Sequence, residues 1–287
     1  MNNRCSSFVR VAFYEAFDRI GVLSILAAAG MNLSFLSELH TVVKHSAPVS
    51  FLTPFLFIWC SPRIFPSPHF FMSAFMFFSL SRYPKAGSDL IYHIVRMNRI
   101  KWIACEIASM LLYIFAFTIC QFMLSIFAML PFVTPSVDWG EEILILLESA
   151  QSKWNGGIPY AIIYQLKQTD AFALTIVLWL LYCAFGELVI LVTRLLNPRL
   201  KFLGIGLFFG LYFYDYICEY SLPYVYRYFS PVALSRMSYL NLGFDPSLPP
   251  IRYSMCFYLI CITLFTCITV LLAKHVNIDD LSSRTYQ

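Results

Sequence analysis

Three acidic residues lie within or at the edges of long apolar segments of this chain, and they are the first candidates for chemistry. They are Glu106, Glu187 and Asp215. A charge at the centre of a bilayer costs about 3 kcal/mol on insertion scales, so such acids usually face a helix-bundle interior or water. Each acid could line a transport pathway or make a structural contact. The structural partner would be Arg194 for Glu187 and Lys101 for Glu106, and Asp215 is expected at the outer interface.

Residues that could bind a metal or act as nucleophiles show no organised spacing. The nine cysteines and five histidines are scattered, and no two cysteines form a CxxC pair. This spacing predicts neither a disulfide framework nor a metal site. The chain also lacks the GxxxxGK[ST], GxSxG and HExxH motifs. We therefore expect no enzymatic activity, no metal and no cofactor in this chain, and nucleic acid is not among its expected partners.

The composition indicates that these residues are carried by membrane-spanning helices. Hydrophobic residues make up 59% of the chain and charged residues only 13%, whereas soluble domains carry about 25% charged residues. Several apolar blocks have a length of about 18 to 22 residues, which is what a helix needs to cross a bilayer. We predict a single all-α membrane domain over residues 1–287. Its six expected spans are residues 20–37, 64–80, 102–132, 171–192, 202–218 and 253–273.

Charges between the spans predict the topology. Residues 82–101 and 194–201 are rich in Lys and Arg, whereas residues 139–170 carry four acids against two lysines. Basic loops stay on the cytoplasmic side, so both termini are expected inside the cell, in a multi-pass protein of the cell membrane. Residues 46–60 are expected as an outer segment that partly enters the membrane.

The residues before the first span show no pattern of a removable signal peptide. Phe13, Phe17 and Ile20 recur there at helical spacing. This pattern predicts an amphipathic helix on the inner membrane surface, or else an ordinary extension of the first span.

A second amphipathic helix is predicted between the second and third spans, over about residues 88–100. Ser88 can cap it, and its polar face carries Asp89, His93, Arg96 and Arg99 opposite an apolar stripe. Such a helix would lie flat under the membrane. It could anchor the neighbouring spans to anionic headgroups, or it could dock onto a cytosolic partner and transmit force to the spans.

Gly206 and Gly210 form a GxxxG pattern in the fifth span. Small residues at this spacing allow two helices to approach closely. The close contact could form within the chain or with a second subunit.

These residues together resemble a known family. A proline-bearing second span followed by R-x-x-R-x-x-W, here Arg96, Arg99 and Trp102, is similar to the permease subunits of type-2 ABC exporters, particularly small ones of Gram-positive bacteria. Glu106 departs from the pattern, because an uncharged polar residue such as Gln is expected one turn into the third span. Further pieces of the likeness are Ser136 with Trp139-Gly140, Gly186, Asn197 and Ser230-Pro231.

The resemblance implies a six-span half-transporter that works with a separate P-loop ATPase and pairs with a second permease chain, identical or similar. The helix over residues 88–100 would be its coupling helix. Residues 218–252 would return into the outer leaflet as short helices, although a plain outer loop is an alternative. The substrate would be hydrophobic or amphipathic, such as a peptide, a lipid-linked compound or an antimicrobial.

Two other functions remain open from the sequence. A non-transporting membrane module, such as an immunity or sensor protein, would bind a peptide without moving it. An intramembrane transferase would need acids and histidines at one membrane depth. Such a site is not favoured, because His93 and His275 are expected on the inner side and His40 and His45 on the outer side.

Overall fold

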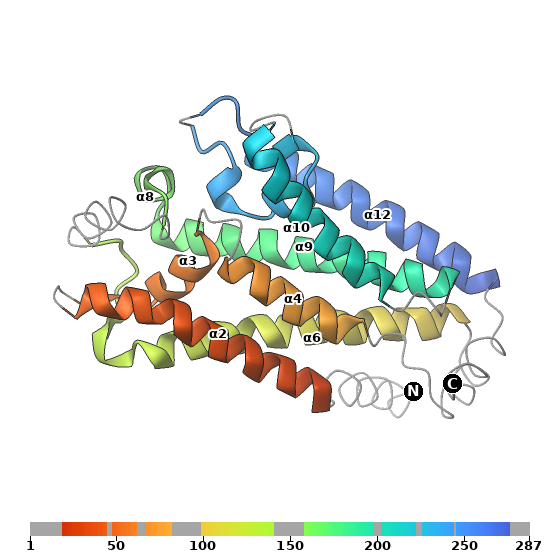
Figure 1. Cartoon of the computed structure of the whole chain (residues 1–287), viewed down its shortest axis with the longest axis horizontal. Coiled ribbons are helices and arrows are strands. Elements are labelled where there is room, and N and C mark those ends of the chain that lie inside the picture. Colours follow the sequence, from red (N-terminus) through yellow and green to blue (C-terminus); the bar gives the residue numbers. More distant parts are fainter. Residues whose placement is uncertain are drawn as a thin grey trace, which may run out of the picture.

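Long helices dominate the computed structural model (Figure 1), which describes residues 19–44, 48–61, 67–81, 99–140, 158–197, 202–221, 226–243 and 245–275. Four helices are long and apolar enough to span a membrane. The chain is therefore an all-α membrane protein by the length and composition of these helices. They are α2 (Arg19–Val43), α6 (Arg99–Ala128), α9 (Gln168–Leu196) and α12 (Ile251–His275).

Two shorter helices complete the bundle, α4 (Pro68–Leu80) and α10 (Leu203–Ser221). The 13 residues of α4 extend over about 20 Å, which is less than the hydrocarbon thickness of about 30 Å. A separate short helix, α3 (Thr53–Trp59), lies beside the start of α4 and is buried along almost its whole length. The Ser67 side chain accepts a hydrogen bond from the Phe70 backbone N–H (3.0 Å) and so caps α4.

Successive helices run in alternating directions along the bundle, with α2, α6 and α10 pointing one way and α4, α9 and α12 the other (Figure 1). Two arginines connect helix ends at one side of the bundle, which we call the basic end. Arg99 at the start of α6 donates to the Lys274 carbonyl in α12 (2.7 Å). Arg194 near the end of α9 donates to the Ser81 carbonyl after α4 (2.9 Å).

The central helix is α9, which contacts α3, α4, α6, α10 and α12. Its Trp179 is buried and donates from the indole N–H to Thr118 Oγ1 on α6 (3.0 Å). Two glycines let α10 lie close to α9. A side chain at Gly186 would overlap Phe77 and Phe208, and a Cβ at Gly204 would lie 2.7 Å from Ile190 Cγ1.

The end of the bundle opposite the basic end carries the irregular parts of the described chain. A parallel pair of two-residue strands, β1 (Val49–Ser50) and β2 (Val133–Thr134), aligns Val49 with Val133. The remaining short elements are η1 (Leu130–Phe132), α8 (Tyr160–Gln165), η3 (Tyr226–Tyr228), α11 (Pro231–Leu234) and η4 (Met237–Tyr239). Short helices thus occur within the described part of residues 218–252, as expected, and their return into the outer leaflet stays a prediction.

A tight turn leads from the short helices into α12. The carboxylate of Asp245 accepts hydrogen bonds from the Ser247 backbone N–H (2.9 Å) and hydroxyl (2.5 Å). These bonds hold the pKa of Asp245 below its usual value, because they stabilise the charged form. Gly243 has a φ of 105°, a conformation that glycine adopts without strain.

The helix bounds differ from the predicted spans. The helices at the first, fourth and sixth spans are longer at both ends than predicted, because periodicity locates apolar residues and not the polar ends of a helix. At the third and fifth spans the helix is extended at one end and shortened at the other. The second span was predicted to start at residue 64, whereas α4 starts at Pro68, after residues 62–66, which lie outside the described part. The predicted amphipathic helix before residue 19 also lies outside it.

Candidate functional site

A buried polar cluster lies where α4, α10 and the short helices meet. It consists of His69 and Ser73 from α4, Tyr212 from α10, and Ser235 and Arg236 from the turn between α11 and η4, and we call it the His69 cluster. All five side chains are buried, and Arg236 is fully so. Buried polar groups are costly unless they are hydrogen-bonded, so such a concentration is informative.

The imidazole of His69 bridges two elements that are far apart in the sequence. Its Nδ1 lies 2.6 Å from the Tyr212 hydroxyl, and its Nε2 lies 3.2 Å from Ser235 Oγ. The Tyr212 hydroxyl also lies 2.7 Å from Ser73 Oγ, which in turn donates to the His69 carbonyl (2.7 Å). One imidazole therefore joins α4 to both α10 and the short helices.

One set of donors accounts for most of this network with a single proton on the imidazole. Ser73 donates to the His69 carbonyl, the Tyr212 hydroxyl donates to Ser73, and His69 Nδ1–H donates to Tyr212. The Ser235 hydroxyl donates to the Val232 carbonyl (2.7 Å) and lies 3.2 Å from His69 Nε2. Its single hydrogen can serve either the carbonyl or the Nε2 lone pair, but not both.

Arg236 anchors the short helices at a second point. Its Nη2 donates to the Ser61 carbonyl after α3 (2.5 Å), and its guanidinium lies 4.9 Å from the centroid of the Tyr239 ring. The buried carboxylate of Asp215 interacts electrostatically with Arg236 and accepts a hydrogen bond from Ser230. A guanidinium and a carboxyl group are thus both buried at the junction of α10 and the short helices.

Aromatic rings enclose the His69 cluster from the side of α3 and α9. The His69 ring lies 5.2 Å from Trp179 and 5.4 Å from Tyr182, and Trp179 packs edge-on against Trp59 at 4.2 Å. Edge-on and tilted ring pairs at these separations are favourable contacts. This wall holds the imidazole in one position.

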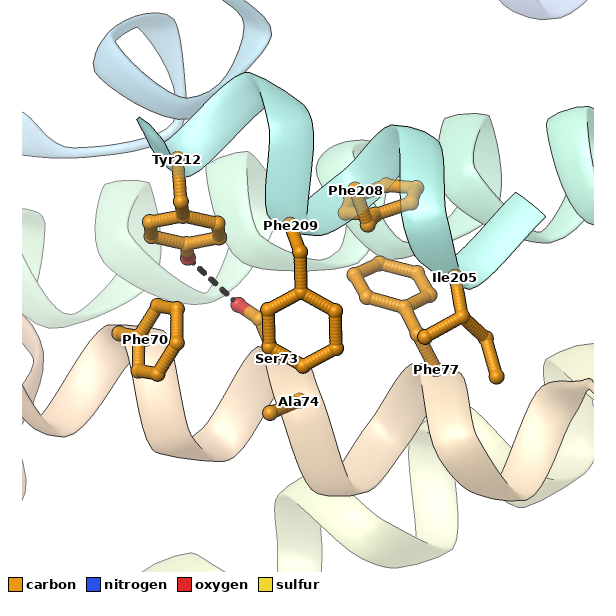
Figure 2. A pocket seen from close by; sticks show the side chains of 8 residues that line it. All are labelled: Phe70, Ser73, Ala74, Phe77, Ile205, Phe208, Phe209 and Tyr212. Carbon is orange, nitrogen blue, oxygen red and sulfur yellow. Dashed lines mark hydrogen bonds between the residues drawn. The ribbon is translucent and has the colours of Figure 1, made fainter. Parts of the chain in front are cut away.

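A narrow apolar groove with about 10 Å³ of free volume runs along α4 and α10 beside the cluster (Figure 2). Phe77 and Phe208 stack at 3.6 Å at one end, and the hydroxyls of Ser73 and Tyr212 lie at the other, bonded to each other. The surface of the groove is therefore apolar along its whole length.

Glu106 is buried on α6 near the basic end. Its Oε1 accepts a hydrogen bond from the indole N–H of Trp102 (3.1 Å), and the carboxylate interacts electrostatically with Arg194. The Glu106 carboxylate therefore interacts with Arg194 on α9. Lys101, the partner expected from the sequence, has an exposed side chain. This environment favours the structural interpretation of Glu106 over a pathway role.

Glu187 is buried in α9 and is not paired as expected. Both of its carboxylate oxygens have no hydrogen-bond partner among the described residues, and Arg194 instead donates to Ser81. Its neighbour one turn earlier is Cys183, which is also buried. The sequence-based pairing of Glu187 with Arg194 is therefore not what the structure contains.

The isolation of Glu187 gives a direct prediction. We expect Glu187→Gln to leave the midpoint of thermal unfolding unchanged or slightly higher, because a neutral amide of the same shape is no harder to bury than an unpartnered carboxyl group. Glu106→Gln is the matched control and should lower stability by about 1 kcal/mol, since Arg194 loses its carboxylate. A larger loss of stability for Glu187→Gln than for Glu106→Gln would contradict the conclusion that the Glu187 carboxyl group is buried without a partner among the described residues.

The other predicted site residues are placed as follows. A Cβ at Gly206 or Gly210 would meet no described atom within 4 Å, so the predicted packing contact is not made within the described part of the chain. Asp215 was expected at an interface, yet its side chain is buried beneath the short helices. Arg99 is tied to α12 through Lys274. The positions of Asp89, His93 and Arg96 lie outside the described residues.

Sequence reasoning missed His69, Tyr212 and Arg236. A histidine and an arginine within apolar, proline-containing segments were the available signal, because membrane segments rarely retain such residues without a partner. Within the described residues, no three His, Cys, Asp or Glu side chains gather in a way that could hold a metal ion.

No family model, curated protein or solved structure matches this chain.

Proposed function

We propose that this chain is the permease subunit of a type-2 ABC exporter that crosses the cell membrane six times with both termini inside. The observation that carries the proposal is the largely buried run of residues 226–240 between α10 and α12. Its short helices bring Ser235 and Arg236 to His69, deep inside the bundle. Irregular backbone at membrane depth is tolerated only where protein covers it or where it lines a cavity. A covered, dipping segment before the last span is what the resemblance implies.

The helix order agrees with this proposal. The helices alternate in direction (Figure 1), and the end of α4 and the start of α6, which flank the expected coupling helix in the sequence, lie at the basic end. Arg99 connects the start of α6 to α12 directly after this segment. Closure of a partner ATPase against the coupling helix would therefore act on α6 and, through Arg99, on α12.

The expected substrate is hydrophobic or amphipathic. The aromatic lining of the narrow groove between α4 and α10 supports this class, although its free volume of about 10 Å³ would have to widen to admit a substrate. Two permease chains would form the pathway between them, and ATP hydrolysis would expose it alternately to the two sides of the membrane. The energy would come from a separate P-loop subunit.

The first test is purification of the tagged chain from its native membrane in mild detergent, followed by identification of bound proteins and an ATPase assay. We expect a P-loop ATPase to co-purify with the wild-type chain, and Arg96→Glu to remove at least about nine tenths of it. Reversing one charge at a protein interface replaces attraction by repulsion and can cost several kcal/mol.

Two further variants separate docking from folding. Lys167→Glu reverses an exposed charge at the start of α9, far along the helix from the basic end, and should keep the ATPase bound. Arg99→Gln should weaken the bundle as well as docking, because Arg99 also bonds to α12. A chain that emerges alone, without ATPase activity, would overturn the exporter proposal and favour a non-transporting immunity or sensor protein.

A further inference from the structure

The short helices between α10 and α12 depend on outside contacts for their position. Each of η3, α11 and η4 contains only three or four residues. Helices of this length are not stable alone, because the free-energy cost of helix nucleation exceeds the stabilisation from so few backbone hydrogen bonds. The side chains that hold these helices therefore decide where they lie.

One set of contacts fixes the short helices to α12. Ser254 donates to the Leu234 carbonyl (2.6 Å), Tyr258 donates to the Pro231 carbonyl, and Tyr253 donates to the Tyr228 carbonyl (3.0 Å). All three donors lie on the first two turns of α12. These contacts would survive if α12 and the short helices moved as one unit.

A second set of contacts fixes the same helices to α3, α4 and α10, and it includes a hydrogen bond from Tyr239 in η4 to Glu219 on α10 (3.4 Å). Ser235 bonds to His69, which bonds to Tyr212, and Arg236 donates to the Ser61 carbonyl. Hydroxyl and imidazole bonds of this kind each contribute modestly to stability. A motion that separates the short helices from α4 would have to break this set first.

We propose that the His69–Tyr212–Ser235 hydrogen bonds form a latch that holds the short helices closed against α4. Release of the latch would let the short helices move away from α4. The role of this motion rests on the proposed export function, in which it would open the outer end of the transport pathway. The latch itself does not depend on that function.

A cysteine beneath the latch can report its release. Cys60 is fully buried, and its Sγ lies 3.4 Å from Thr175 Oγ1. Thr175 in turn lies 3.1 Å from Met237 Sδ in η4. Because Met237 belongs to the short helices, their displacement would uncover this side of Cys60.

The experiment is time-resolved labelling of the full chain in nanodiscs with a membrane-impermeant maleimide, quantified for each cysteine by peptide mass spectrometry. We expect Tyr212→Phe and Ser235→Ala each to raise the labelling rate of Cys60 about fivefold, since each removes one of the two hydrogen bonds that His69 makes in the latch. Tyr164→Phe and Ser34→Ala are the matched controls, because both residues are exposed, and they should leave the rate unchanged.

Cys183 is the internal control within the same molecules. It is as buried as Cys60, but it lies on α9 and forms no hydrogen bond with His69, Tyr212 or Ser235. A rise at Cys60 alone supports a local latch. An equal rise at Cys183 would show general loosening of the bundle and would overturn the latch, as would an unchanged rate at Cys60 in both variants.

The labelling is measured on the permease without its ATPase, so it can fail separately from the proposed function. A rise at Cys60 in a chain that binds no ATPase would support the latch while refuting the exporter. Unchanged Cys60 labelling in a chain that does bind an ATPase would refute the latch and leave the exporter in place.

Discussion

Replacing Arg236 by methionine is expected to lower the free energy of unfolding by about 3 kcal/mol, because breaking a buried charge interaction from one side leaves the other charge uncompensated. Arg236 is fully buried and donates to the Ser61 carbonyl. Methionine fills a similar volume but cannot donate, so the buried carbonyl also loses this bond. The loss should appear in unfolding titrated with SDS in mixed micelles.

The carboxylate left behind is that of Asp215. Its Oδ1 has no hydrogen-bond partner within the described part of the chain. Arg236 is the positively charged residue that interacts with it most strongly. We therefore expect Asp215→Asn to restore part of the stability lost in Arg236→Met. The coupling energy from the double-mutant cycle should be at least about 1 kcal/mol, as for other residues that share one network.

Arg227→Met is the matched control for this cycle. Arg227 belongs to the same short-helix segment and lies 4.9 Å from the Tyr239 ring, but it is only half-buried. Partly exposed cation contacts contribute less, and we expect a loss below about 1 kcal/mol. Equal losses at the two arginines, or no coupling between Arg236 and Asp215, would contradict the buried-charge account.

The long helices were predictable because the bilayer restricts the backbone structures that an apolar segment can adopt. An apolar block without charges, such as residues 253–273, must be helical to satisfy its backbone in lipid. The corresponding helix α12 covers Ile251–His275. The second span was harder to predict, since prolines divide it, and the structure contains the separate helices α3 and α4 there.

The His69 cluster was not predictable because it is assembled from three distant segments. His69 and Ser235 are 166 positions apart in the sequence. Tyr212 lies between them. No spacing rule connects such residues, and a lone tyrosine in an apolar helix is typical of an interfacial belt. Burial and distance, which only the fold supplies, identify them as one site.

The glycines of α9 and α10 also show that sequence spacing alone does not predict which residues make contact. Gly206 and Gly210 have the GxxxG spacing, yet the close approach of α10 to α9 occurs at Gly186 and Gly204. Spacing reports which glycines share a helix face, but it does not report which face meets a neighbour. The outward position of Gly206 and Gly210 leaves contact with a second subunit as the open alternative.

Gly186→Val is therefore expected to lower the free energy of unfolding by about 3 kcal/mol, at the upper end of the cost of overpacking a core. A side chain there would overlap the rings of Phe77 and Phe208, which are buried and stacked at 3.6 Å. The stack joins α4 to α10, so the displaced rings would also push these helices apart. Phe77→Leu should rescue part of the loss, because a smaller side chain leaves room for the valine.

Gly206→Val and Gly210→Val are the matched controls on α10. Their added side chains meet nothing within 4 Å among the described residues, so monomer stability should change by no more than about 0.5 kcal/mol. A loss of dimer in crosslinking, with monomer stability unchanged, would place the second subunit against this face. A loss of monomer stability at Gly206 or Gly210 as large as at Gly186 would show that α10 packs in a different rotation.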